Sequence, residues 1–449
     1  MSTTNLPSLS ENTFLRYFNF IALYFAQGVP EGMLLFGIPA WMAMNGKSAG
    51  EIASFAIACG LPWSFKFIVA PMMDRYTILS MGRKRPWVIF GQLGLMTSFI
   101  LMSFIPDPLN NLNLLMLFGF IVSFFGAFQD VATDGMAVDI IPIEEQARAN
   151  GFMWGSKIVG TSSSLALGSW LLNTYSFAIS IAMLSILVGF IMLVPIFLKE
   201  RPGEKTLPWT KGQASPENKK LQVTNWKTIF KSLFSVFSLK NSLLIAIIGF
   251  IVCGCQNYMD ILLPLFTVKN LGWTDLAYSQ VFATSSLIGG ISGMLIGGIL
   301  IDKFGKKRML NTYLLVLITS TLLIAFLKNF WVNTLLINSY MFIYSLLMVF
   351  CNIGFFAICM ECCWKKISAS QFTLYMTISN IGRIAFAALI SPIRTNFSWE
   401  ISIISFSIFI FISWVLLQFL NINHQVKSIE HLEKKDIESQ GMLVTLTQV

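Results

Sequence analysis

Two stretches, DRYTILSMGRKR (Asp74–Arg85) and DKFGKKR (Asp302–Arg308), carry the same pattern in the two halves of the chain. In each, an aspartate and a basic residue end an apolar block, and a glycine with three basic residues opens the next block. A pattern that returns in the second half of a sequence indicates duplication. We therefore expect two related halves, each with a polar loop between two long apolar helices.

The composition is typical of a membrane protein. Of 449 residues, 55% are hydrophobic and 12% are charged, whereas soluble domains are roughly 25% charged. Apolar blocks of about 20 residues, the length that crosses a bilayer as a helix, recur along the chain. We predict an all-α, polytopic fold of twelve transmembrane helices in two pseudo-symmetric six-helix bundles. The predicted spans are 15–38, 48–71, 87–105, 113–137, 150–173, 177–197, 243–266, 277–301, 309–327, 333–360, 369–392 and 398–420.

A polar, basic stretch separates the two predicted bundles. The expected segments are a first bundle at 1–198, a linker at 199–240, a second bundle at 241–422 and a tail at 423–449. Within the linker, apolar residues from Trp226 to Phe237 follow helical spacing, with Lys227 and Lys231 on the other face. Such a helix either lies on the membrane surface or packs between the bundles.

Basic residues are distributed unevenly between the two sides of the predicted bundles. The loops opposite both termini hold only Lys47, Lys269, Lys328 and Arg394. Because Lys and Arg stay on the cytoplasmic side of spanning helices, we expect both termini in the cytoplasm and the protein in the inner (plasma) membrane. The net charge of +9 follows from this asymmetry, and no nucleic-acid partner is needed to explain it.

Ionisable residues inside the spans also repeat. Glu31 and Asp260 each stand four residues after a glutamine, and Lys157 and Arg383 form a second pair with nearly the same separation. Charged side chains within a membrane usually face a cavity or another protein group. A polar cluster at equivalent positions of both halves is typical of a transporter site. The residues expected to bind substrate are Gln27, Glu31, Lys157, Gln256, Asn257, Tyr258, Asp260 and Arg383.

The apolar stretch FFGAFQDVATDGMAVDI, residues 124–140, contains three carboxylates. Asp130 and Asp134 share one helix face because they are four residues apart. Lys157 lies at a matching depth of the next span, and we predict that it pairs with Asp130 or Asp134. Such a group is either a structural ion network that joins two helices or a network that breaks and reforms during transport.

Three further charged residues are expected near span ends. Lys66 is close enough to the inner end for its ammonium to snorkel into water. Asp139 and Glu361 are expected at solvated helix ends, with Asp139 capping its helix.

The sequence disfavours catalysis in the membrane region. Its two histidines, His424 and His431, lie in the tail, and neither a nucleophile motif nor metal-ligand spacing is present. We therefore predict no enzyme activity, no metal and no cofactor. The seven cysteines lie in or beside apolar blocks, so we expect them to pack rather than to form disulfides.

An ion gradient is the expected energy source. The chain has no GxxxxGK[ST] motif for ATP, and without a histidine in the membrane a proton must be carried by a carboxylate. Sodium remains an alternative. The residues expected in proton coupling or its ion network are Glu31, Asp130, Asp134, Lys157 and Asp260.

The two opening stretches resemble the loop signature of the major facilitator superfamily. Within it, YFAQGVPEGMLLFGIPAWM, GLPWSFKFIVAPMMDRY with GRKRPW, and FQDVATDGMAVDIIPIEEQARANG are similar to the AmpG-like muropeptide permeases and the related acetyl-CoA transporters, and SNIGRIAFAALISP extends the likeness more weakly into the second half. The resemblance implies two rocking six-helix bundles, inward transport, proton coupling and gating loops. The implied gating residues are Asp74, Arg75, Arg83, Arg85, Asp302, Lys303, Lys306 and Arg308.

The function expected from these features is secondary-active, proton-coupled import of a bulky anionic solute, with an anhydro-muropeptide as the first candidate. A siderophore importer of the same superfamily and a membrane receptor that no longer transports are the alternatives. The expected partners are the small-molecule solute and membrane lipids, and the protein is expected to work as a monomer.

Overall fold

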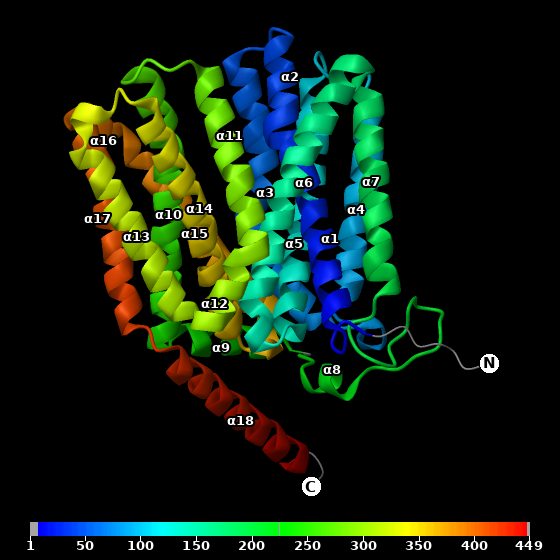
Figure 1. Cartoon of the computed structure of the whole chain (residues 1–449). Helices are drawn as coiled ribbons and strands as arrows, with labels where there is room; N and C mark the ends of the chain where they lie inside the picture. Colours follow the sequence, from blue (N-terminus) through cyan, green and yellow to red (C-terminus); the bar gives the residue numbers. More distant parts are fainter. Residues whose placement is uncertain (1–7, 224, 447–449) are drawn as a thin grey trace.

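Two groups of long helices stand side by side in the computed structural model, which describes residues 8–223 and 225–446 (Figure 1). The first group comprises α1 (Thr13–Gly32), α2 (Ile38–Met44), α3 (Ala49–Arg75), α4 (Arg85–Ser103), α5 (Leu112–Ile140), α6 (Gln146–Thr174) and α7 (Phe177–Phe197). The second comprises α10 (Lys240–Lys269), α11 (Asp275–Ser292), α12 (Gly298–Phe304), α13 (Lys306–Phe326), α14 (Thr334–Glu361), α15 (Ser368–Ala388), α16 (Ile390–Asn396) and α17 (Trp399–Phe419).

Three further helices lie at one end of these groups, the face at which α1 begins and α17 ends (Figure 1). We call this face the base. The three helices are α8 (Pro216–Lys220), α9 (Trp226–Phe237) and α18 (Ile422–Leu446). The apolar spacing in the linker therefore predicted α9 at its observed bounds, whereas the domain limits remain predictions.

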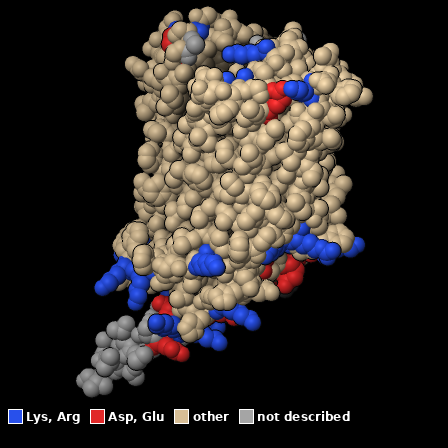
Figure 2. All heavy atoms as spheres, turned by 90° about the vertical axis from the view of Figure 1, so that its left-hand side faces the viewer, with Lys and Arg blue, Asp and Glu red and all other residues tan. Residues whose placement is uncertain are grey.

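The fold is all-helical and polytopic, as the sequence predicts. Among the described residues, eleven helices are long and apolar enough to cross a membrane. In the fifth predicted position stands α6, which is 29 residues long but carries Lys157 and a run of serines that lower its hydropathy. Figure 2 shows a broad middle zone without Lys, Arg, Asp or Glu on one face, between charged groups at the two ends.

Two helices that the sequence predicts as single spans change geometry along their length. A π-helical turn (Met33–Gly37) joins α1 to α2 just after Pro30, which cannot donate a backbone hydrogen bond. A second π-helical turn (Gly293–Gly297) joins α11 to α12 in the other group. Such turns are frequent at functional sites in helices.

Glycines bring two helix pairs into backbone contact. A Cβ atom on Gly28 of α1 would overlap the backbone of α6 at Lys157, and one on Gly160 of α6 would overlap the backbone of α1 at Phe25. In the second group, a Cβ atom on Gly382 of α15 would overlap the backbone of α10. The pairs α1–α6 and α10–α15 are thus held close by positions that tolerate no side chain. All seven cysteines are buried and free of disulfides, as expected.

Candidate functional site

Glu31 of α1 and Lys157 of α6 form an ion pair inside the first group of helices. Lys157 Nζ lies 2.8 Å from Glu31 Oε2. The same ammonium lies 5.2 Å from the ring centre of Trp63 and 5.4 Å from that of Trp154. A carboxylate and two aromatic faces therefore stabilise the cation together. The close approach of α1 and α6 at Gly28 explains why the two charges meet.

A cavity of about 360 Å³ opens beside this ion pair. Its lining includes Glu31, Trp63 and Lys157 from the first group of helices. Asn380 and Arg383 of α15 line it from the second group. A solute in this cavity therefore touches both groups and meets two basic side chains.

Arg383 is oriented by amide side chains of its own group. Its Nη2 donates to Gln256 Oε1 at 3.0 Å, and Asn352 Nδ2 donates to the same oxygen at 3.1 Å. Asn257 Nδ2 donates to the Arg383 carbonyl at 2.9 Å. A guanidinium has five N–H groups, so this arrangement leaves donors for an anion.

A second cavity, of about 200 Å³, lies on the other side of Gln256. It is lined by Asp260, Tyr344 and Asn352 of the second group and by Trp154 of the first. The Tyr344 hydroxyl donates to Asp260 Oδ1 at 3.0 Å. Among the described residues that line it, this cavity has a carboxylate, Asp260, and no basic residue, whereas the larger one has two basic groups and the Glu31 carboxylate.

The two halves differ where their charges repeat. Glu31 and Lys157 are ion-paired. In the part of the chain that the structure describes, the equivalent Asp260 and Arg383 form no ion pair within 4 Å, and Gln256 binds Arg383 instead. The positive charge of Arg383 is consequently less neutralised than that of Lys157.

Three predicted substrate residues, Gln27, Asn257 and Tyr258, line neither cavity. Asn257 donates to the Arg383 carbonyl instead. Tyr258 is fully buried and donates to the Ser402 carbonyl of α17 at 3.0 Å. Gln27 is also fully buried, and neither residue lines the two cavities. The shared spacing predicted their depth, but the sequence does not fix which helix face they occupy.

A separate ion network in the first group of helices joins α3 to α5. Lys66 Nζ of α3 lies 2.6 Å from Asp130 Oδ2 of α5, and both side chains are buried. The Tyr24 hydroxyl donates to Asp134 Oδ1. The other Asp134 oxygen is buried without a hydrogen-bond partner among the described residues.

This network corrects two predictions. Lys157 does not pair with Asp130 or Asp134, because its partner is Glu31. Lys66 does not snorkel, because its ammonium turns inward to Asp130. Matching depth made Lys157 a plausible partner, but the rotation of α3 and α6 about their axes decides which base faces the acids.

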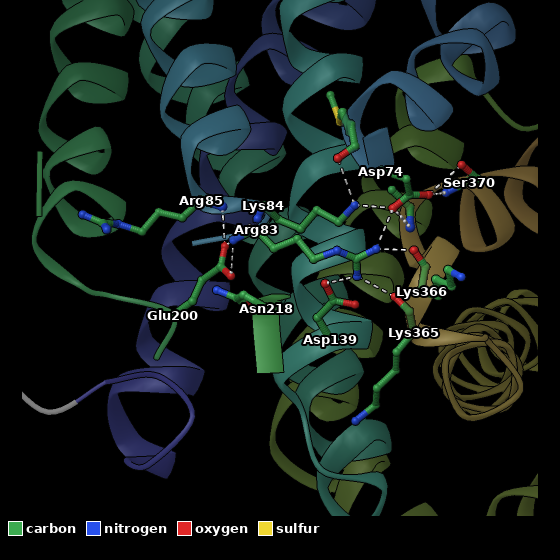
Figure 3. A network of polar contacts seen from close by, with 12 residues as sticks. Asp74, Arg83, Lys84, Arg85, Asp139, Glu200, Asn218, Lys365, Lys366 and Ser370 are labelled. Carbon is green, nitrogen blue, oxygen red and sulfur yellow. Dashed lines mark hydrogen bonds and ion pairs between the residues drawn. The ribbon is translucent and has the colours of Figure 1, made fainter. Parts of the chain in front are cut away.

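At the base, Asp74 joins the two groups of helices (Figure 3). Its Oδ1 pairs with Lys84 and lies 3.6 Å from Arg83 Nη2. Its Oδ2 accepts the Ser370 amide at 2.8 Å and the Ser370 hydroxyl at 2.6 Å, both from the first turn of α15. Since the start of a helix carries partial positive charge, the carboxylate is well matched to this site.

Arg83 extends the same contact (Figure 3). Its Nη1 lies 2.9 Å from Asp139 Oδ2 and 2.5 Å from the Lys365 carbonyl, and its Nη2 donates to the Lys366 carbonyl. The expectation that Asp139 is a solvated helix cap is wrong, because its side chain is fully buried in this ion pair.

Asp302 repeats the arrangement from the other group. Its two oxygens accept the amides of Ala147 and Arg148 at 3.1 and 3.0 Å, in the first turn of α6. Thus each group places one aspartate on the start of a helix in the other.

Lys306 is the counterpart of Arg83. Its Nζ lies 2.7 Å from Glu361 Oε2, and it donates to the Ile143 carbonyl at 3.0 Å and to Gln146 Oε1 at 2.9 Å. Glu361 was expected at a solvated end, but it is largely buried in this pair. The base is therefore closed twice by equivalent contacts.

The linker is anchored to the first of the two repeated loops, Asp74–Arg85. Glu200 accepts the backbone amides of Arg83, Lys84 and Arg85 (Figure 3). Nearby, Asn218 Nδ2 donates to Glu204 Oε1 at 2.7 Å. Burial, reinforced by the Glu200 carboxylate, raises the pKa of Glu204 to about 8.

The remaining predicted gating residues have other partners. Arg85 donates to carbonyls of the helix before the linker and of the linker, including Pro195. Arg75 lies over aromatic rings, and Lys303 lies over Phe304. Arg308 is exposed.

Several residues of the site escaped sequence reasoning. Trp63 and Trp154 contact Lys157, and Tyr344 and Asn352 hold the polar groups of the second cavity. Their only signal is a polar or amphipathic side chain within a span. Glu200 had a clearer signal, since it is an acid at the start of a basic linker.

Two related groups of helices, cavities between them and a base closed by equivalent contacts define a membrane transporter. The chain belongs to the Major Facilitator Superfamily, whose sequence profile matches residues 20–387.

The sequence is similar to that of the anhydromuropeptide permease of Escherichia coli (strain K12), with 24% identity over 376 residues that cover 81% of this chain and 71% of the relative. It is also 24% identical over 374 residues to the putative transporter AmpG 1 of Rickettsia prowazekii (strain Madrid E), covering 76% of this chain and 83% of the relative.

Solved transporters share the fold. The superfamily transporter FucP, in a crystal structure titled as the outward conformation, matches with a TM-score of 0.67 at 12% identity, covering 90% of this chain and 98% of FucP. The human organic anion transporter MFSD10 (TETRAN) matches with a TM-score of 0.65 at 12% identity and the same coverage.

Proposed function

We propose that this protein is a secondary-active, proton-coupled importer of a bulky anionic solute of the muropeptide type. The observation that carries the proposal is the larger cavity, in which Lys157 and Arg383 come from different groups of helices. A solute with a carboxylate can bind both basic groups, and guanidinium suits a planar anion. The names of the AmpG-type relatives support the muropeptide class.

Transport in this scheme requires the base to open. The contacts of Asp74 and Asp302 with the opposite group must break while the cavity closes on its other side. We further propose that the base is cytoplasmic, with both termini inside and the chain in the inner membrane, since most basic residues lie there. The protein acts as a monomer, and catalysis and cofactors have no part in this scheme.

Asp134 is our candidate for the proton carrier. One oxygen accepts the Tyr24 hydroxyl, and the other is buried without a partner among the described residues. Asp130 is less suited, because Lys66 neutralises it at 2.6 Å. Asp134 therefore has room to bind and release a proton without first breaking an ion pair.

The test is uptake into proteoliposomes of known orientation. An anhydro-muropeptide and a ferric siderophore are offered in parallel, with and without an inward proton gradient. We expect gradient-stimulated uptake of the muropeptide, and we expect Asp134→Asn to remove the stimulation while Asp130→Asn mainly lowers stability. Uptake of the siderophore alone would favour the other importer, and specific binding without uptake of either would favour a receptor.

A further inference from the structure

A cavity of about 520 Å³ lies at the base, apart from the solute cavities. It is formed where α3 ends and α4 begins, together with Gln222 of the linker. Its lining includes Arg75, Tyr76, Trp87 and Phe90, and no acidic residue lines it among those that the structure describes. The cavity thus combines one cation with aromatic walls.

Arg75 has no acidic ion-pair partner in the part of the chain that the structure describes. Its guanidinium lies 5.0 Å from the ring centre of Tyr76 and 4.9 Å from that of Trp226 in α9. Within residues 8–223 and 225–446, no carboxylate lies within 4 Å of it, whereas the adjacent Asp74 pairs with Lys84. The rings hold the guanidinium in place, and its N–H donors remain available to an anion.

The cavity lies between the ends of two helices that are long and apolar enough to span a membrane, where lipid headgroups are expected. The span containing α3 ends at Arg75, and the span containing α4 begins at Arg85. The Trp87 indole N–H donates to the Tyr76 carbonyl at 2.6 Å. Trp and Tyr favour the boundary between hydrocarbon and water, so a phosphate beside Arg75 has acyl chains at the level of Phe90.

The outer face of α9 continues the same surface. Phe230 and Phe234 are 57% and 77% exposed, and the exposed Lys227 and Lys231 lie beside them. Trp226 stacks on Phe230 with ring centres 6.1 Å apart. Exposed aromatic rings beside lysines are typical of a helix that lies on an anionic membrane surface.

The opposite face of α9 is part of the protein core. Ile229 and Val236 are buried in a cluster with Trp364 and Ile367. This cluster includes the segment whose carbonyls accept hydrogen bonds from Arg83. The sequence left two roles for this helix, and its two faces are suited to both.

We propose that an anionic phospholipid binds in this cavity, with its phosphate on Arg75 and its headgroup charge near Lys227 and Lys231. Its acyl chains lie over Trp87 and Phe90. Among the described residues, the cavity lining contains Arg75 and no acid, and the exposed Lys227 and Lys231 of α9 lie on the surface that continues it. This charge favours an anionic over a zwitterionic lipid. Bound lipid holds α9 against the base and so favours the closed base.

Native mass spectrometry of the purified full chain, loaded with phosphatidylglycerol or phosphatidylcholine, tests the site without any transport assay. We expect wild type to retain phosphatidylglycerol preferentially, and Arg75→Gln to lower its apparent affinity about fivefold, as for one basic group at an anionic surface. Arg75→Lys should keep the preference. Lys303→Gln, at the equivalent place in the second half, is the matched control.

Quenching of tryptophan fluorescence by brominated phosphatidylglycerol provides a second measurement, because Trp226 contacts Arg75. In wild type, Trp226→Phe should reduce the quenching by brominated phosphatidylglycerol. In a chain that carries Arg75→Gln, the same Trp226→Phe substitution should leave the quenching unchanged. Equal retention of the two lipids by wild type, or equal loss in Arg75→Gln and Lys303→Gln, would overturn the proposal. If millimolar inorganic phosphate displaces bound phosphatidylglycerol as effectively as added lipid does, the site binds anions in general. This result would also overturn the proposal.

Discussion

Asp74 and Asp302 make the same contact in opposite directions. Asp74 accepts the Ser370 amide at the start of α15, and Asp302 accepts the Ala147 and Arg148 amides at the start of α6. Each aspartate belongs to one group of helices, and each helix start belongs to the other. The base is therefore closed by two equivalent contacts, and loss of either leaves the other in place.

Asp74→Asn should shift the protein toward an open base. The substitution removes the ion pairs with Lys84 and Arg83, and loss of one partner of a buried pair costs about 3–5 kcal/mol. Alkylation of the buried thiols near the base, Cys362 and Cys363, is the readout, and we expect at least a tenfold faster rate. Lys47→Gln, which breaks a surface pair with Glu51 away from the base, is the control. An unchanged rate in Asp74→Asn would contradict a gating role.

Lys66→Met should destabilise the protein by about 3–5 kcal/mol, because it leaves Asp130 buried without a cation. Asp130→Asn in the same chain should recover much of this loss. Thermal unfolding in detergent measures both variants. Lys47→Gln, which breaks a surface pair with Glu51 at 3.3 Å, should cost only about 0.2–1 kcal/mol. Additive losses in the double variant would show that the two charges are not coupled.

Arg383→Gln should weaken binding of an anionic solute while leaving protein yield unchanged. Loss of a charge-assisted contact in a buried site costs about 2–5 kcal/mol, which corresponds to at least a tenfold increase in KM for uptake. Arg383→Lys should recover part of the affinity, since it keeps the charge but not the planar fork. Arg394→Gln, at the other end of the helices, is the control. A lower yield with an unchanged KM would make Arg383 structural.

The docked linker should loosen as the pH rises. The pKa of Glu204 is raised from 4.5 to about 8 by burial and by Glu200, while Arg201 and Arg85 act in the opposite direction. Between these pH values the docked linker binds more protons than the undocked linker. The contribution of protonated Glu204 to the stability of the docked linker therefore falls with rising pH and is lost by about pH 8.

Limited trypsin digestion of the linker measures this effect. Cleavage of wild type, divided by that of Glu204→Gln at the same pH, should increase between pH 6 and pH 8.5. Glu217→Gln, at an exposed position of α8, should behave as wild type. A constant ratio across this range would exclude Glu204 as the titrating group.

The sequence predicts where a residue lies along its helix better than it predicts which neighbour the residue faces. The depths of Glu31, Lys157 and Arg383 followed from hydropathy, and all three line the larger cavity. The partner of Asp130 did not follow, because a rotation of α3 decides whether Lys66 faces lipid, water or protein. A pattern of polar residues contains little information on that rotation when the helix is apolar on every side.

The gating loops show the same limit. Their repeat identified them, but the burial of Asp139 depends on Arg83 crossing the base to the Lys365–Lys366 carbonyls. No local pattern records a contact across so many residues. The linker acid Glu200 likewise acquires its role only when the chain returns to the first loop.

The glycine contacts indicate which distances between residues are expected to change during transport and which are expected to stay fixed. Gly28 and Gly160 bring α1 into backbone contact with α6, and Gly382 does the same for α15 and α10. We therefore expect each helix pair to move as one rigid unit. Glu31 and Lys157 belong to the α1–α6 pair, and Gln256 and Arg383 belong to the α10–α15 pair. Neither contact therefore needs to change during a transport cycle. We expect the separation between Lys157 and Arg383 to change during transport. Spin labels placed on α6 and α15, one in each helix pair, should record this change.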